Sequence, residues 1–190
     1  MDHTQLDTVN KAEENGLSRK VKPVENTEKF KEVFLYILDK VGKKRNVGKT
    51  VIFKLFYFID FDFYEKYEQQ LIGALYRKCP FGPVPTLFET IVSSMIEDKE
   101  VEKIMVEFRG MKQERYSPLR KPNLDRLSAK EIILIDEVLS RLSDKNATEI
   151  SDYSHRDIPW EVTDDSEIID YETVFDRTPE YSARRGYGDE

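Results

Sequence analysis

Residues 49–64 read KTVIFKLFYFIDFDFY, and apolar or aromatic side chains fill almost every position of this stretch. From Val51 to Tyr64, eleven of fourteen residues are Val, Ile, Leu, Phe or Tyr. A surface helix buries one stripe along its length, whereas a helix that is apolar on all sides needs contacts all round. A membrane span needs about 20 apolar residues, and this shorter run contains two aspartates. The stretch therefore predicts a buried helix at the centre of a soluble domain.

The chain has 190 residues, a length that favours one domain with flexible ends. We expect an N-terminal arm at residues 1–26, a single domain at 27–177 and a C-terminal tail at 178–190. The first sixteen residues, MDHTQLDTVNKAEENG, lack the apolar segment of a secretory signal. Cys79 is the single cysteine, which excludes an internal disulfide framework and a multi-cysteine metal site. These features predict a cytoplasmic protein.

The net charge of -7 is concentrated at the C-terminal end of the chain. Residues 161–190 contain ten acids and three arginines, and the other 160 residues balance with 27 acids and 27 bases. A balanced body with an acidic end is poorly suited to neutralising phosphates, so nucleic acid is a disfavoured partner. A basic cluster at Lys43–Lys49 is interpreted as a solvated loop.

Apolar periodicity and turn residues predict the other elements. The Ser128–Glu131 spacing predicts a capping box at the start of one helix. The N-terminal half is expected to contain a helix from an N-cap at Thr27 to Gly42, the aromatic helix ending near Tyr67, an extended segment Leu71–Lys78, a stiff CPFGPVP turn and a helix Pro85–Asp98. A hairpin of Val101–Phe108 with Gln113–Leu119 about Gly110 should follow. The C-terminal half is expected to contain helices after Ser128 and at Ala147–Ser154, a loop through Pro159 to Trp160, and a short docking segment between Ile168 and Phe175.

This order predicts an α+β fold that is mainly α-helical. We expect a buried central aromatic helix, a small β-hairpin or a three-stranded winged-helix-like element, and additional C-terminal helices. A winged-helix DNA-binding regulator is therefore an alternative function. The helix that would read DNA, Pro85–Asp98, contains no Lys or Arg, the residues that most often contact bases and phosphates.

No constellation of catalytic residues is apparent in the sequence. Gly48-Lys49-Thr50 resembles the end of a phosphate-binding loop, but Gly42 stands one residue too far away and follows a helix. His155 has only His3 as a second histidine, which leaves no histidine-rich metal site, and we expect it to bond a backbone carbonyl near the Ile158-Pro159-Trp160 bend. Neither a metal nor a cofactor is predicted, and an enzyme is the less favoured alternative.

Asp60 is the most informative polar residue of the aromatic helix. Because Asp60 and Asp62 are two residues apart, they point in different directions and do not form a carboxylate pair. A carboxylate between Ile59 and Phe61 must face solvent or bond a partner, for which Lys54 and Tyr64 are candidates. A structural polar contact is the favoured interpretation of Asp60, and a ligand or protein contact is the alternative.

Three sequence blocks resemble the SocA-like Panacea domain family. They are KLFYFIDFDFYEKY, LIGALYRKCPFGPVP and SDYSHRDIPW, and the resemblance covers about Phe30 to Phe175. The family motif of a Lys-Leu-hydrophobic-Tyr helix, a Gly-Pro-Val turn, a Ser-His segment and a Pro-Trp pair corresponds here to Lys54–Tyr57, Gly82–Val84, Ser154–His155 and Pro159–Trp160. Related sequences often carry a glycine after the aromatic helix, where this chain has Glu68.

The resemblance implies an antitoxin of a bacterial or phage two-gene system. Such proteins neutralise a protein toxin by direct binding and sometimes act as proteolytic adaptors, so the implied partners are a toxin and a protease, without a membrane. Aromatic side chains are the expected anchors of an interface. The candidate partner-binding residues are Tyr57, Asp60, Tyr64, Phe81, His155 and Trp160, with Tyr67 as a further aromatic. Core packing is the alternative for each aromatic candidate, and the structural contacts described above are the alternative for Asp60 and His155. The expected structural motif consists of Lys54, Gly82, Pro83 and Pro159.

Overall fold

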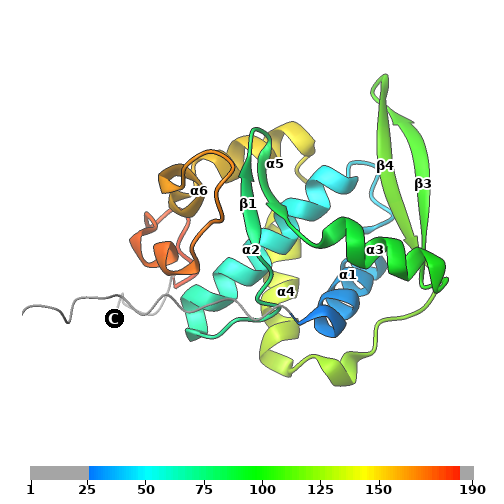
Figure 1. The fold of residues 1–190 in the computed structure, drawn as a ribbon, viewed down its shortest axis with the longest axis horizontal. Helices are drawn as coiled ribbons and strands as arrows, with labels where there is room; N and C mark the ends of the chain where they lie inside the picture. Colours follow the sequence, from blue (N-terminus) through cyan, green and yellow to red (C-terminus); the bar gives the residue numbers. More distant parts are fainter. Residues whose placement is uncertain (1–25, 185–190) are drawn as a thin grey trace, which may run out of the picture.

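Helix α2 (Lys49–Tyr67) crosses the centre of the computed structural model, which describes residues 26–184 (Figure 1). Every residue from Val51 to Glu65 is buried except Phe53, which is half-buried. The predicted buried aromatic helix is thus confirmed. The helix ends at Glu68, whose φ of 52° is left-handed although glycine is the residue that adopts this conformation most easily.

Four further helices build the body of the domain together with α2. They are α1 (Thr27–Val41), α3 (Phe88–Glu97), α4 (Ala129–Leu142) and α5 (Ala147–His155). The N-cap of α1 is Asn26, one residue before the predicted Thr27, because the Asn26 side chain accepts the Lys29 backbone N–H at 3.0 Å. The Ser128–Glu131 capping box is present at the start of α4. The mainly helical α+β fold class is confirmed.

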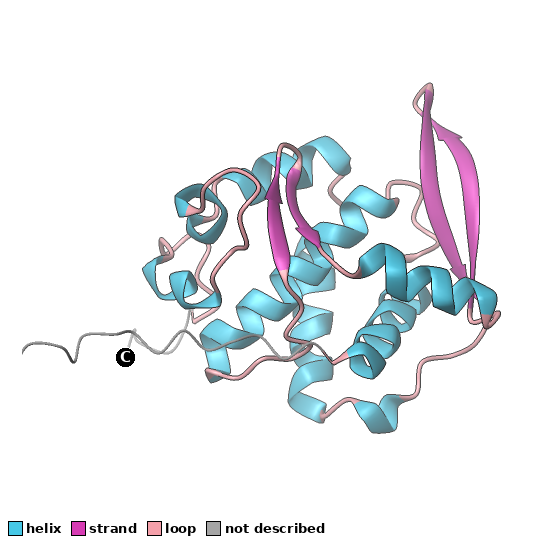
Figure 2. Cartoon of the chain, in the orientation of Figure 1, coloured by secondary structure: helices cyan, strands magenta, loops and turns pink. Residues whose placement is uncertain are grey.

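The strands form two separate antiparallel hairpins (Figure 2). The predicted hairpin about Gly110 is confirmed as β3 (Val101–Phe108) and β4 (Met111–Pro118). The three-stranded winged-helix-like element is not formed within residues 26–184. Instead β1 (Tyr76–Cys79) pairs with β2 (Gly82–Pro85). The predicted CPFGPVP turn therefore contains the last residue of β1, a two-residue turn and the whole of β2. Two prolines are accepted in β2 because a two-stranded sheet leaves edge positions that need no donor.

The C-terminal part of the domain packs against α2 and β1. A one-turn helix η1 (Leu124–Arg126) precedes α4, while α6 (Ile158–Val162) and η2 (Tyr171–Asp176) follow α5. The predicted loop through Pro159 is corrected to α6, since proline is accepted in the first turn of a helix. Between α6 and η2 the backbone runs along β1, where Lys78 N–H donates to Glu167 O and Ile169 N–H to Tyr76 O, both at 2.9 Å.

The domain continues past the predicted boundary at residue 177. Tyr181 is 5% exposed and its ring stacks on Tyr153 with centroids 4.6 Å apart. Residues 178–184 are therefore packed against the body and not part of a free tail. The rest of the predicted tail and the predicted arm, except Asn26, lie outside the described residues. No helix within residues 26–184 combines the length and apolar character that crossing a membrane requires.

Candidate functional site

The motif segments that are far apart in the sequence meet beneath the β1–β2 hairpin. Gly82 lies over α2 and α5: a methyl group in place of its hydrogen would stand 2.5 Å from Ser154 Oγ and 2.6 Å from Lys54 Cε. His155 stacks on Trp160 of α6 with ring centroids 4.3 Å apart. We call these five residues the motif cluster. It joins α2, β2, α5 and α6 at one point.

Gly82 has the backbone conformation that the cluster needs. Its φ of +98° disfavours any residue with a Cβ, and the surrounding side chains leave no space for one. Pro80 and Phe81 form the turn before it, because Cys79 pairs with Gly82. The glycine thus allows the hairpin to pack closely against Lys54, with the turn on the outer side.

Lys54 is a buried lysine without a carboxylate partner. Lys54 is 1% exposed, and no carboxylate of the described residues pairs with it. Burial lowers the pKa of Lys54 from 10.5 to about 8, with the Cys79 sulfur opposing the change. A strongly perturbed buried lysine is a feature more common at functional sites than in ordinary cores.

His155 differs from its predicted role. The expected bond to a backbone carbonyl is wrong, because within residues 26–184 the ring makes no hydrogen bond and instead stacks on Trp160. Burial, with the nearby charge of Lys54, lowers the pKa of His155. The buried nitrogens His155 Nε2 and Trp160 Nε1 both lack partners among the described residues. The stacked pair is held by packing, with Lys78 Nζ on the indole at 4.2 Å from its centroid.

The six predicted partner-binding residues differ sharply in exposure. Phe81 is 76% exposed at the hairpin turn, and His155 and Trp160 are half-buried. Tyr57 and Asp60 have no exposed surface, and Tyr64 is 4% exposed. In this conformation the buried three cannot touch a partner. The further aromatic Tyr67 is 37% exposed at the end of α2.

Asp60 makes the structural polar contact that the sequence favours, but with other partners than Lys54 and Tyr64. Its carboxylate accepts the Ile72 N–H at 2.7 Å, the Tyr76 hydroxyl at 2.9 Å and the Tyr171 hydroxyl at 3.1 Å, with weaker contacts from two further backbone N–H groups. Burial raises the pKa of Asp60 although these donors oppose it. Asp60 therefore anchors the segment that leads into β1.

The other buried tyrosines also hold the core together. Tyr57 donates to Asp157 Oδ2 at 2.8 Å, and burial raises its pKa. Tyr64 donates to the carboxylate of Glu172, and burial raises its pKa too. Both hydroxyls already donate hydrogen bonds inside the protein. Tyr57 and Tyr64 could therefore contact a partner directly only in a different conformation.

Arg177 is a structural residue that the sequence reasoning missed. Its fully buried guanidinium donates to Asp62 at 2.7 Å, Glu65 at 2.9 Å and Asp157 at 2.6 Å. The signal was present in the sequence, because Asp62 and Glu65 on a buried helix require a cation. Arg141 supplies a second bond to Asp62 at 2.6 Å.

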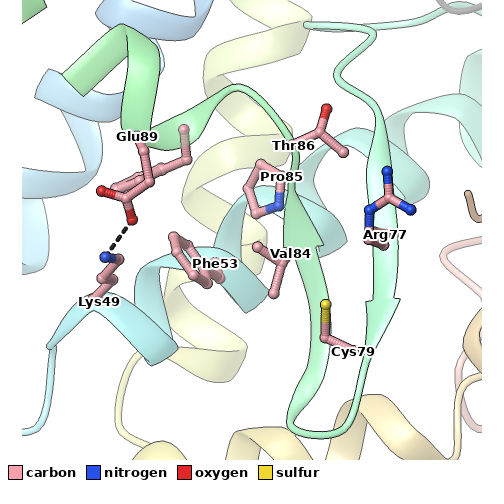
Figure 3. Close-up of a pocket in the computed structure, with 9 residues that line it drawn as sticks. Lys49, Phe53, Arg77, Cys79, Val84, Pro85, Thr86 and Glu89 are labelled. Carbon is pink, nitrogen blue, oxygen red and sulfur yellow. Dashed lines mark ion pairs between the residues drawn. The ribbon is translucent and has the colours of Figure 1, made fainter. Parts of the chain in front are cut away.

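A cavity of about 370 Å³ lies beside the same hairpin (Figure 3). Phe53, Val84 and Pro85 form apolar parts of its lining, and Cys79 lies at one side. The Lys49–Glu89 ion pair crosses its rim, so that most of the charge of Lys49 is compensated. This hollow suits an apolar side chain better than an ion. Within residues 26–184 no group of three or more His, Cys, Asp or Glu side chains is placed to hold a metal.

Comparison with protein families gives one match, to the family described as antitoxin SocA-like, Panacea domain, at residues 52–161. The matched segment includes all five residues of the motif cluster. Comparisons with curated proteins and with solved structures found no match.

Proposed function

The chain belongs to the SocA-like antitoxin family with a Panacea domain, and on that premise we propose that it neutralises a protein toxin by direct binding. The proposal assigns the chain no catalytic role, cofactor or metal, and places it in the cytoplasm with the toxin. Its contact surface lies at the turn of the β1–β2 hairpin.

The observation that carries this proposal is the exposure of Phe81 directly above the motif cluster. Three family motif segments lie below the fourth, which is part of the hairpin, while the turn presents a phenyl ring that is 76% exposed. A large aromatic side chain on a rigid support loses little conformational entropy on binding and can fill a pocket of the partner. The rigid support explains why buried residues such as Lys54 belong to a binding motif.

The surface around Phe81 extends toward α6. Val162 is 59% exposed, and Trp160 lies beneath Lys78 with part of its ring open to solvent. Lys78 donates to Thr163 O at 2.7 Å, which ties β1 to the end of α6. We call Phe81, Lys78, Trp160 and Val162 the hairpin-tip surface. Its exposed part is apolar, because the Lys78 side chain is largely buried and its ammonium is paired with Asp165 at 3.7 Å, and this composition favours a partner with an apolar patch.

DNA binding is the weaker alternative for this fold. Helix α3 occupies the place of a reading helix, but it has no Lys or Arg and exposes Glu89 and Glu97. These carboxylates would face phosphates with the same sign of charge. A role as proteolytic adaptor differs from simple blocking only in what happens to the toxin after binding, and both begin at the same surface.

Co-expression with the product of the adjacent gene tests the proposal. The neighbour alone should arrest growth, and the wild-type chain should relieve the arrest and co-purify with it. Phe81→Glu should abolish both effects, whereas Ile133→Glu should preserve them, because Ile133 is 58% exposed on α4, outside the hairpin-tip surface. Thermal unfolding of the purified variants would check that both remain folded.

Two outcomes would contradict this assignment. If Phe81→Glu relieves toxicity as well as the wild type does, the hairpin tip is not part of the interface. If the product of the adjacent gene does not arrest growth, it is not the toxin that the proposal requires. Toxin that disappears only while an intact cellular protease is present would indicate delivery for proteolysis, whereas stable inactive toxin would indicate blocking.

A further inference from the structure

Strand β3 has an open edge that the rest of the described chain does not cover. It pairs with β4 over eight positions, and no other strand in residues 26–184 pairs with it. The ribbon projects away from the helices with β3 on its outer side (Figure 1). Its inner strand is fixed to the body, because Arg115 donates to Gly42 O at 2.7 Å and Gln113 to Asn46 O at 3.3 Å.

The open edge combines exposed backbone with exposed apolar side chains. Met105 is 59% exposed and Ile104 is 39% exposed, and as neighbours in a strand they point to opposite faces. A long uncovered edge of this kind is a template for pairing with another strand. The other hairpin offers no comparable edge: the backbone bonds of Lys78 and Ile169 join β1 to the segment that follows α6, and two of the four residues of β2 are prolines, which have no N–H to donate.

The order of residues in β3 is complementary to itself. We propose that two copies of the chain pair antiparallel through β3, with Met105 opposite Met105 across a two-fold axis. In this register Lys103 lies opposite Glu107 of the second copy, and the symmetry repeats that pair. Ile104 likewise lies opposite Val106 twice. Opposite charges and apolar pairs are the cross-strand combinations that stabilise a sheet.

Neighbouring registers lack this complementarity. A two-fold axis at Ile104 places Lys103 opposite Met105, and an axis at Val106 places Lys103 opposite Arg109, which is a pair of like charges. Within each ribbon Glu107 already faces Lys112. The Met105 register therefore continues an alternating row of Lys112, Glu107 and the Lys103 of the second copy across the joined sheet.

Self-complementarity identifies a second copy as the occupant of this edge. A foreign strand would have to carry its charges at the same spacing, whereas the chain carries both members of each pair itself. Pairing joins two two-stranded ribbons into one four-stranded sheet, which is more stable than an isolated hairpin. Because a single strand contact buries a small area, the dimer should be weak and dependent on concentration.

Sedimentation equilibrium of the full-length protein alone tests this dimer, without any toxin. The wild type should shift from monomer toward dimer as concentration rises. Lys103→Glu and Glu107→Lys should each weaken the dimer by on the order of tenfold, because each turns both attractive pairs into repulsive ones. Asp152→Lys changes an exposed charge on α5 by the same amount as Glu107→Lys and should leave the dimer unchanged.

Mixing the two weakened variants is the decisive step. A heterodimer of Lys103→Glu with Glu107→Lys has two opposite-charge pairs again, so the mixture should dimerise as the wild type does, and so should the double variant. A wild type that stays monomeric at all concentrations would overturn the proposal. A mixture no more associated than its components would exclude this register.

Discussion

The two hairpins of this protein are built from the same antiparallel unit but are held by different means. The β1–β2 hairpin has strands of four residues, and buried contacts with α2, α5 and the segment after α6 hold it in place. The β3–β4 hairpin has strands of eight residues and is held by its own ladder, by contacts of β4 with α1 and α2, and by contacts of β3 with α3. The short hairpin is therefore stabilised mainly by tertiary contacts, whereas the long hairpin is stabilised mainly by pairing between its own two strands.

The glycines at the two turns give the largest expected contrast. Gly82→Ala should lower the free energy of unfolding by about 2 to 5 kcal/mol, since it combines a positive φ with overpacking against Ser154 and Lys54. Gly110→Ala, at φ +77° with no atom within 4 Å of the new methyl group, should cost only about 1 kcal/mol. Urea denaturation of both variants measures the difference.

Equal losses in the two variants would break the comparison. They would mean that backbone strain alone sets the cost, and that the contacts of Gly82 with the motif cluster add nothing. A double variant of Gly82→Ala with Ser154→Ala, which removes the nearest atom, should recover part of the loss.

The difference between the hairpins also explains which of them could be predicted from sequence. A glycine between two extended segments is a local signal, and Arg109 and Gly110 both adopt the positive φ of a two-residue hairpin turn. By contrast, Gly82–Pro85 contains two prolines and no alternation, and it forms a strand only because it packs against α2 and α5. Propensity alone indicated a turn there.

The candidate site shows the same limit. The motif residues were found by their resemblance to a family, but their meeting point depends on how α5 and α6 return to α2, a long-range contact that no local pattern encodes. The partners of Asp60 were missed for this reason, since Tyr171 approaches from 111 positions further along the chain. The solvent exposure of the aromatic residues could not be predicted either, because nothing in the sequence distinguishes the exposed Phe81 from the buried Tyr57.

Lys54 gives a second, intermediate test of the buried hairpin. The unfolded chain has the ordinary lysine pKa of 10.5, and burial lowers the pKa in the folded protein to about 8. Between these values the unfolded chain binds more protons, so the stability of the wild type should rise with pH. The loss of folding stability caused by burying the charged lysine is fully present below about pH 8 and amounts to about 3 kcal/mol at most.

Lys54→Met should remove this pH dependence and stabilise the protein at neutral pH by about 1 to 3 kcal/mol. Urea denaturation at a series of pH values measures both effects. Lys43→Met, on an exposed loop, should keep the wild-type curve. Parallel curves for wild type and Lys54→Met would show that Lys54 reaches solvent or a partner in the folded protein.

The smallest expected effect concerns one apolar side chain on each hairpin. Val84 is half-buried in the wall of the cavity beside β2, so Val84→Ser should cost about 1 to 2 kcal/mol through lost packing against Phe53 and its neighbours. Met111 is 69% exposed at the tip of the long ribbon, and Met111→Ser should change stability by less than about 0.5 kcal/mol. Urea denaturation of dilute protein, where the monomer dominates, measures both. A loss at Met111 as large as that at Val84 would mean that the ribbon tip is packed in solution, against the body or a second copy, and the division between a held and a free hairpin would then fail.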